Sequence, residues 1–367
     1  MIGTQGPTNT DAGGDRWPIN DDVIRLRAWG TERSHVLPTT PGTEWIIGSG
    51  PACWLRLEDR KGRISRKHAI LSRRDGRWLL RDAGSKNGMV VDGTRRDEIV
   101  LEPGLEIWFG GIMMIAESGR LVALRSFLGR VLGWASNRTK VVDQALHSVR
   151  TAATRQTALV LCGGGDLVSL SRAVHRHAFG VDRPFIVCDP RRKQSDENVR
   201  AAENHRSGIE ALEVARSGSL CIWNNQLPQD FAEVMVAIKD PDTRVQLIVC
   251  ARETTEAEAF GVSPIAIPPL RDRAGELPRI VEDYVHDATT ELGVPRTSFP
   301  TEDRDWVVKY AAESLPEIEK ATLRLAAIRE AGGNMNRAAA RLGMARWSLA
   351  KWVNRRKLPM HVVDADE

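Results

Sequence analysis

The sequence predicts a multidomain protein that consists of a β-sandwich, an α/β unit with a parallel sheet, and an all-α C-terminal region. Three changes of pattern along the chain predict this. Short apolar runs separated by Gly, Asp and Asn turns fill residues 21–118, which is typical of a sandwich. Wholly apolar strands then alternate with helical patterns, which indicates a parallel sheet covered on both faces. From about residue 270 every pattern is helical.

The elements follow from the local patterns. In the first region we expect strands over 22–29, 44–48, 54–58, 68–74, 77–83, 89–93 and 106–117. In the second we expect strands over 156–162, 183–189, 218–223 and 244–251, alternating with helices over 137–153, 167–178, 209–216 and 230–240. The expected divisions are a disordered tail over 1–20, the sandwich over 21–118, the α/β unit over 119–265, the lid over 266–316 and the helix-turn-helix over 317–360.

The composition is that of an ordinary globular protein, with 42% hydrophobic and 27% charged residues among 367. No apolar run approaches the roughly 18 residues that span a bilayer, and the polar start of the chain has no signal-peptide core. We therefore expect a cytoplasmic protein without a membrane partner. The five cysteines form no CxxC pair, which favours small buried side chains over a metal site.

A first group of motifs lies in the sandwich region: "IIG" at 46–48, "ISRKHAIL" at 64–71 and "AGSKNG" at 83–88. The order and spacing of Ser-x-x-His and Gly-Ser-x-Asn-Gly closely resemble those of the forkhead-associated (FHA) domain. The resemblance implies a reader of phosphothreonine, with Ser65 and Arg66 at the phosphate and Lys86 and Asn87 on the peptide. The implied structural residues are Gly48, His68 and Gly88.

One position departs from the FHA pattern. The family carries an Arg after its first Gly as a main phosphate anchor, whereas here Gly48 is followed by Ser49. Arg66, Lys67 or Arg63 are the candidates to replace that charge, since cations give the strong contacts to phosphate. The alternative is a degenerate sandwich that binds unphosphorylated protein.

A second resemblance covers "RAVHRHAFGVDRPFIVCD" at 172–189, "ARSGSLCIWNNQLPQDF" at 215–231 and "IPPLRDRAGELPRIVEDYV" at 267–285. These are similar to the AAA+ domain of sigma-54-dependent activators. The ATPase chemistry is missing: Leu167 stands where the phosphate-loop Lys belongs, Asp166 adds negative charge, and Trp223 and Asn224 replace the Walker B acids. We expect a pseudo-ATPase that serves packing and interaction, with no cofactor and no catalytic residue. An active ATPase would have to bind nucleotide without the Lys.

The same region contains an H-x-H pair, His175 and His177. No acidic or Cys partner stands near it in the sequence, so a metal site is disfavoured. We expect one exposed and one half-buried histidine on a helix.

The C-terminal motif is "EKATLRLAAIREAGGNMNRAAARLGMARWSLAKWVNRRKLP" at 319–359. Its Gly-Gly-Asn, Ala-Ala and Leu-Gly-Met steps resemble the Fis-type helix-turn-helix, which implies DNA binding by a dimer. The implied DNA-binding residues are Arg346, Trp347, Lys351, Arg355 and Arg356. The alternative is a helical hairpin that packs on the lid.

Together these resemblances predict a bacterial transcriptional regulator that reads a phosphothreonine-containing partner and binds DNA as a homodimer or higher oligomer. The competing hypothesis is a phosphoprotein-binding adaptor without specific DNA binding. Steep salt dependence of DNA binding distinguishes the two.

Overall fold

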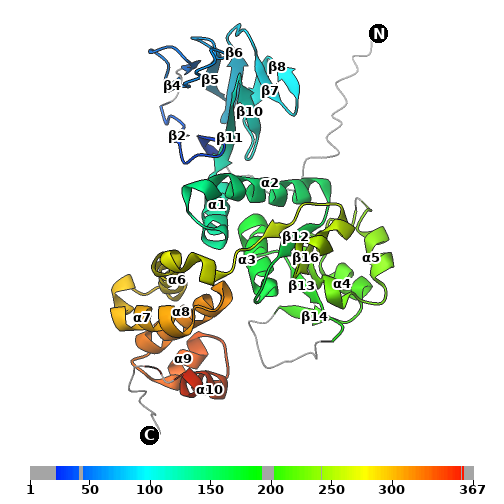
Figure 1. The fold of residues 1–367 in the computed structure, drawn as a ribbon, viewed down its shortest axis with the longest axis vertical. Coiled ribbons are helices and arrows are strands. Elements are labelled where there is room, and N and C mark those ends of the chain that lie inside the picture. The colour runs from blue at the N-terminus through cyan, green and yellow to red at the C-terminus, as the bar shows by residue number, and fades with distance from the viewer. Residues whose placement is uncertain (1–21, 41–43, 192–201, 241, 357, 359–367) are drawn as a thin grey trace, which may run out of the picture.

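The computed structural model describes residues 22–40, 44–191, 202–240, 242–356 and 358. The chain forms a β-sandwich, two connecting helices, an α/β unit and a helical lobe (Figure 1). The predicted tail over 1–20 lies outside the described residues.

The sandwich consists of two sheets that enclose one core. The first sheet has the order β2-β1-β11-β10-β7-β8 and the second the order β4-β3-β5-β6-β9. Alternating side chains such as Leu26, Ile47, Leu71 and Leu80 are fully buried between them, as period-2 strands require. The bounds are β1 Val23–Ala28, β2 Ser34–Val36, β3 Trp45–Gly48, β4 Leu55–Arg56, β5 Ala69–Arg74, β6 Arg77–Asp82, β7 Met89–Val91, β8 Thr94–Arg96, β9 Glu98–Val100, β10 Glu106–Phe109 and β11 Ile112–Ser118.

The sandwich passes into the first helix without a linker. Ser118 ends β11 and is also the N-cap of α1 (Gly119–Leu132), where its Oγ accepts the Leu121 N–H at 3.3 Å. A serine cap satisfies one of the unpaired N–H groups that begin every helix. Helix α2 (Thr139–Arg155) then packs on α1, and the pair separates the sandwich from the rest of the molecule (Figure 1).

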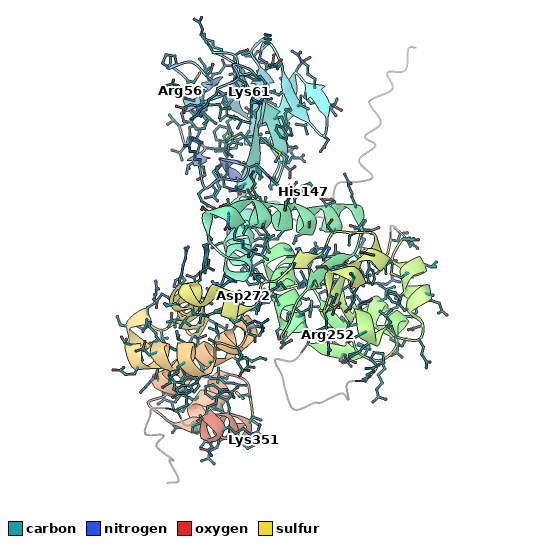
Figure 2. The ribbon with its side chains drawn as sticks, in the orientation of Figure 1. Arg56, Lys61, His147, Arg252, Asp272 and Lys351 are labelled. Carbon is teal, nitrogen blue, oxygen red and sulfur yellow. The ribbon has the colours of Figure 1, made fainter. Side chains whose placement is uncertain are left out.

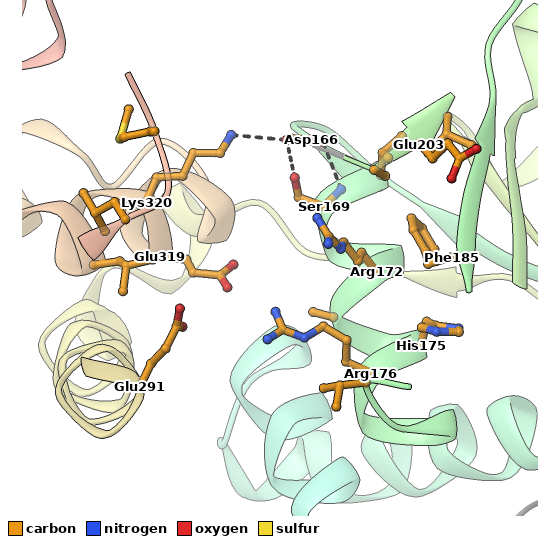
Figure 3. A pocket seen from close by; sticks show the side chains of 18 of the residues that line it. Asp166, Ser169, Arg172, His175, Arg176, Phe185, Glu203, Glu291, Glu319 and Lys320 are labelled. Carbon is orange, nitrogen blue, oxygen red and sulfur yellow. Dashed lines mark hydrogen bonds and ion pairs between the residues drawn. The ribbon is translucent and has the colours of Figure 1, made fainter. Parts of the chain in front are cut away.

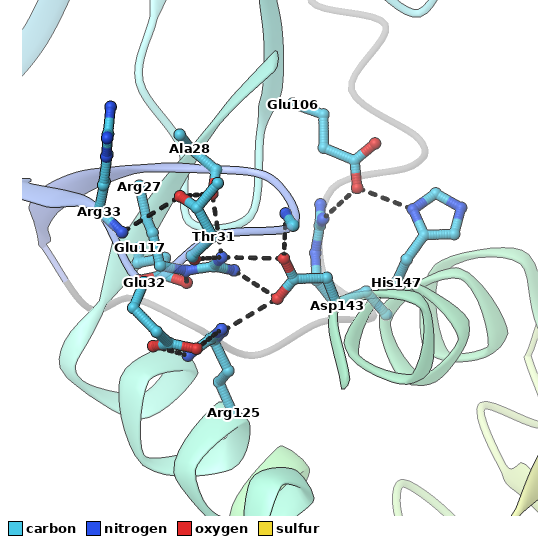
Figure 4. Close-up of polar contacts among 12 residues, drawn as sticks. Arg27, Ala28, Thr31, Glu32, Arg33, Glu106, Glu117, Arg125, Asp143 and His147 are labelled. Carbon is cyan, nitrogen blue, oxygen red and sulfur yellow. Dashed lines mark hydrogen bonds and ion pairs between the residues drawn. The ribbon is translucent and has the colours of Figure 1, made fainter. Parts of the chain in front are cut away.

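Buried ion pairs fix this junction (Figure 4). Asp143 of α2 accepts from Arg27 of β1 at 2.8 and 2.9 Å and from Arg125 of α1 at 2.9 Å. Arg27 also donates to Glu117 of β11 at 2.7 Å. Arg27, Glu117 and Asp143 are at most 1% exposed. Because each buried charge has an opposite partner, the network ties the two units together.

The α/β unit contains a parallel sheet of order β14-β13-β15-β16-β12-β17. This confirms the predicted parallel sheet with helices. The bounds are β12 Leu159–Cys162, β13 Phe185–Cys188, β14 Glu203–His205, β15 Ser219–Trp223, β16 Gln246–Ala251 and β17 Ile265–Ala266 for the strands, and α3 Leu167–Phe179, α4 Gly208–Val214 and α5 Phe231–Ala237 for the helices.

The C-terminal lobe is helical, as predicted. It comprises α6 Leu277–Leu292, α7 Thr301–Tyr310, α8 Leu315–Glu330, α9 Met335–Arg341 and α10 Arg346–Arg356, and short 3-10 turns lie at 136–138, 224–226, 254–260, 270–276 and 296–298. Its core is continuous with that of α1, α2 and α3. Of the helices described, none has the length and apolar character to cross a membrane.

The expectation for the H-x-H pair was wrong at His175. Its side chain is 2% exposed, and its ring nitrogens contact Ser219 Oγ at 2.8 Å and the Arg183 carbonyl at 3.1 Å. Burial depresses its pKa to about 4, because desolvation disfavours the charged imidazolium. His175 therefore serves the core of the α/β unit. No group of three or more potential metal-ligating side chains lies together among the described residues.

Candidate functional site

His68 joins the two sandwich loops that carry the FHA-like motifs. It is fully buried, and its Nδ1 accepts the Ser65 backbone N–H at 3.1 Å. Its Nε2 therefore carries the proton and donates to the Gly88 carbonyl at 3.0 Å. The ring thus fixes the loop at 63–68 against the loop at 84–88.

Gly48 lets the strand before Ser49 lie directly on the Ser65 loop. A Cβ added at Gly48 would stand 2.3 Å from the Arg66 carbonyl oxygen and 2.8 Å from that of Ser65. The neighbouring Ser49 N–H donates to the Ser65 carbonyl at 3.0 Å. Gly48 is therefore required by close backbone packing.

The second loop is shaped by a carboxylate that sequence reasoning missed. Asp82 accepts the N–H groups of Gly84 and Ser85, each at 2.9 Å, and the Ser85 hydroxyl at 2.6 Å. Ser85 Oγ in turn accepts the Gly88 N–H at 2.9 Å, and Gly88 has φ +69°. The available signal was an Asp two residues before a Gly-Ser turn, which is a common turn-forming arrangement.

Ser65, Lys86 and Asn87 come together at this junction. Ser65 Oγ accepts the Lys86 backbone N–H at 3.0 Å, so its own O–H remains able to donate to a ligand. Asn87 donates from Nδ2 to the Arg63 carbonyl at 2.7 Å. The side chains of Lys86, Asn87 and Arg66 are exposed and Ser65 is half-buried. The arrangement offers a hydroxyl, an amide and two cations to one ligand.

Ser49 does not supply the charge of the Arg that the family pattern carries after its Gly. Its hydroxyl donates to the Ile64 carbonyl at 3.0 Å, so it braces the same loop. Of the cations proposed as replacements, Arg66 and Lys67 are exposed on the Ser65 loop. Arg63 lies 3.5 Å from Asp59 and packs against the turn at Gly110 and Gly111.

Comparison with known proteins agrees with this geometry. Residues 45–110 match the family model of the FHA domain, so the sandwich contains an FHA domain. FHA domains bind phosphothreonine. No curated protein matches the chain.

Several solved structures are similar to about a quarter of the chain. One is the FhaA FHA domain in complex with the intracellular domain of Rv3910, at 30% identity, covering 25% of this chain and 96% of that chain with a TM-score of 0.23. Another is an FHA domain from Chlamydia trachomatis, at 27% identity, covering 25% of this chain and 92% of that one with a TM-score of 0.22. A third is EmbR of Mycobacterium tuberculosis with a low-affinity phosphopeptide, at 22% identity, covering 27% and 25% with a TM-score of 0.24.

In the Gly-rich loop after β12, an acidic side chain of the loop itself, Asp166, lies at the start of α3. Asp166 caps α3 and accepts from Ser169 N at 3.0 Å and Ser169 Oγ at 2.6 Å, and Lys320 of α8 reaches it at 3.3 Å (Figure 3). Burial raises the pKa of Asp166, but the Ser169 hydrogen bonds and the Lys320 charge outweigh it, so the pKa lies below its usual value. Leu167 is 1% exposed and points into the core.

This loop does not fit a nucleotide phosphate. A helix N-terminus after a Gly-rich loop favours one anion, and here the Asp166 carboxylate takes that place. At the end of β15, Asn224 donates to Glu256 at 3.0 Å and Trp223 is half-buried against the core. Asp166 and Asn224 are thus both engaged by neighbouring side chains of the fold.

A cavity of about 1,020 Å³ lies beside this loop, between α3 and the helical lobe (Figure 3). Arg176 and Lys320 line it together with Glu291 and Glu319. Burial raises the pKa of Glu319, although the Arg176 charge opposes the shift. The cavity is thus lined by both positive and negative side chains, and its charge favours neither an anionic nor a cationic ligand.

The helices predicted to bind DNA are formed, and four of the five proposed side chains are exposed. Asn334 caps α9 by accepting the Arg337 N–H at 3.0 Å, and Leu349 and Val353 are buried. The exposed residues are Arg346, Trp347, Lys351 and Arg355.

Arg356 is the exception. It donates to Glu317 of α8 at 2.9 Å and lies over the Trp352 ring at 5.4 Å. The assignment of Arg356 to the DNA-binding residues stays a prediction, and in this structure its charge is paired within the fold.

Proposed function

We propose that this protein reads phosphothreonine through its FHA domain and binds DNA through α9 and α10, as a transcriptional regulator. The observation that carries the first half is the junction of Ser65, Lys86 and Asn87, held by His68 at 3.0 and 3.1 Å. A donor hydroxyl beside exposed cations suits a phosphate dianion.

The second half rests on the surface of α10. Arg346, Lys351 and Arg355 are exposed on one short helix that follows a glycine turn at Gly343, φ +59°. Recognition helices place such residues against base edges and phosphates. The α/β unit then connects the FHA domain to these helices without hydrolysing nucleotide, and a homodimer presents two copies of α10 to paired half-sites.

Peptide binding tests the first half. Fluorescence anisotropy of the full chain with a labelled phosphothreonine peptide is compared with the same peptide carrying Thr. Ser65→Ala removes one hydrogen bond to a charged group, so we expect about ten- to hundredfold weaker binding. Ser34→Ala on β2 is the matched control and leaves the affinity unchanged. Equal affinity for both peptides would contradict phosphothreonine reading.

DNA binding tests the second half. We expect enrichment of specific fragments from a genomic library at low salt, with a steep loss at high salt because contacts to phosphate release counterions. Arg346→Ala reduces the enrichment. Arg74→Ala, an exposed cation at the end of β5, does not.

A specific observation favours a second candidate, the phosphoprotein-binding adaptor. The Arg356–Glu317 pair and the stacking of Arg324 over Trp352 at 5.1 Å bind two cations of this region into the fold. In an adaptor the C-terminal helices pack and associate without reading DNA. Weak binding that is indifferent to Arg346→Ala would favour that function.

A further inference from the structure

The loops around Ser65 carry a marked excess of positive charge. Between residues 51 and 67 and between 84 and 88 the exposed cations are Arg56, Arg60, Lys61, Arg63, Arg66, Lys67 and Lys86. The acids in the same segments are Glu58 and Asp59.

Asp59 is already engaged. Its carboxylate accepts the N–H groups of Lys61 at 3.0 Å and Arg63 at 2.8 Å and lies 3.5 Å from the Arg63 guanidinium. These hydrogen bonds, that of Lys61 first, hold its pKa below the usual value. Asp59 therefore shapes the loop and neutralises Arg63 in part, and Glu58 remains as the other opposing charge.

These cations surround the Ser65 junction. Arg56 of β4 lies opposite Gly48 of β3 in the sheet. The next residue, Ser49, donates its backbone N–H to the Ser65 carbonyl. At the other side of the loop, the Arg63 carbonyl holds Asn87 at 2.7 Å. Residues 56–67 thus form a continuous border around the junction.

The border lies at the free end of the sandwich. Arg63 packs against the turn before β11, whereas the opposite end of β11 leads into α1. Figure 2 shows Arg56 and Lys61 on the sandwich well away from His147 of α2. A partner therefore reaches the border without displacing the α/β unit.

Within the described chain these charges, apart from that of Arg63, are not compensated. The side chains of Arg56, Lys61 and Lys67 make no hydrogen bond or ion pair with described residues, in contrast to Arg27 and Arg81, which pair with acids. Uncompensated like charges repel one another and attract an anionic partner.

We propose that this border selects peptides with Asp or Glu residues flanking the phosphothreonine. The inference rests on the proposed phosphothreonine reading and adds a substrate class to it. Since Ser49 leaves the phosphate without the Arg of the family pattern, affinity is gained from acids on either side. The cations come from separate loop positions, which suits several carboxylates spread along a peptide.

Three peptides of equal length test the proposal with the full chain in fluorescence anisotropy. One carries phosphothreonine among Asp residues, one carries phosphothreonine among Ser and Ala, and one carries Thr among Asp residues. We expect the acidic phosphopeptide to bind about tenfold more tightly than the neutral one at low salt, because several exposed charge pairs each contribute modestly. The difference shrinks in 0.5 M salt, where the Debye length is only a few Å (about 3 Å at 1 M).

Matched double variants assign the effect to the border. Lys61→Gln with Lys67→Gln removes most of the difference between the acidic and neutral phosphopeptides. Arg74→Gln with Arg77→Gln, at the opposite end of the same sheet, preserves it.

The outcomes separate the two proposals. Equal affinity for the acidic and neutral phosphopeptides overturns this inference and leaves phosphothreonine reading intact. Failure to bind either phosphopeptide overturns phosphothreonine reading. Binding of the acidic Thr peptide as tightly as its phosphorylated form overturns both, because charge alone then explains the binding.

Discussion

Asp143 is the side chain on which the junction between the FHA domain and the connecting helices depends most. It is fully buried, and besides Arg27 and Arg125 it accepts the Gly30 N–H at 2.7 Å. Asp143→Ala leaves three cations, Arg25, Arg27 and Arg125, with only two acids, because Glu117 already accepts from Arg25 and Arg27 and Glu32 accepts from Arg125. One positive charge at the junction then has no counterpart. We expect a loss of roughly 3–5 kcal/mol, the usual cost of breaking a buried ion pair.

Urea unfolding and amide hydrogen exchange measure this loss. The free energy of unfolding decreases by about 1–3 kcal/mol per M urea, and at the upper end of this range the expected loss lowers the urea midpoint of unfolding by about 1–2 M. Exchange rises first in β1 and the start of α2, because local opening precedes global unfolding. Glu44→Ala is the control: the Glu44–Arg81 pair is 57% and 49% exposed, so its loss costs under about 1 kcal/mol. A change of the same size in both variants would refute the reasoning.

Two further predictions concern the α/β unit. Burial depresses the pKa of His175 from 6.5 to about 4, so between these pH values the unfolded state binds a proton that the folded state does not. The free energy of unfolding is therefore at its full value above pH 6.5 and decreases as the pH falls toward 4. The decrease in the free energy of unfolding amounts to about 3 kcal/mol. It is measured as an unfolding midpoint that depends on pH, and this dependence is weaker in His175→Gln. Lys320→Ala removes the positive charge beside Asp166, so the pKa of Asp166 rises and hydrogen exchange at the start of α8 accelerates. The control Lys309→Ala on α7 changes neither quantity. An unchanged Asp166 pKa in Lys320→Ala would contradict the ion pair.

Much of the fold could be predicted because strands and helices have local signatures. The apolar runs 156–162 and 244–251 contain β12 and β16, since a strand buried on both faces is apolar throughout. The short strands β2 and β8 were missed because their three residues include almost no apolar side chain. Strand β11 passes directly into α1, because Ser118 ends the strand and Gly119 begins the helix.

The residues of the candidate site could be proposed because they belong to a spaced sequence motif, whereas the ion pairs elsewhere in the fold follow no such motif. Ser65 and His68 are three residues apart, so their motif reports their geometry. The partner of Asp166 is 154 residues away and that of Arg356 is 39 residues away. Such ion pairs depend on tertiary packing, which charge patterns along a chain do not record.

The way in which the units are joined bears on how a phosphorylated partner would act. Ser118 belongs to both β11 and the cap of α1, and Asp143 fixes the same junction through buried charges, so no flexible linker separates the FHA domain from the α/β unit. The Ser65 loops lie at the far end of the sandwich. A ligand shifts a conformational equilibrium only by its differential affinity for two states, and a junction held by several buried ion pairs disfavours a second state. A phosphopeptide bound at the Ser65 loops is therefore expected to leave the arrangement of the C-terminal helices unchanged.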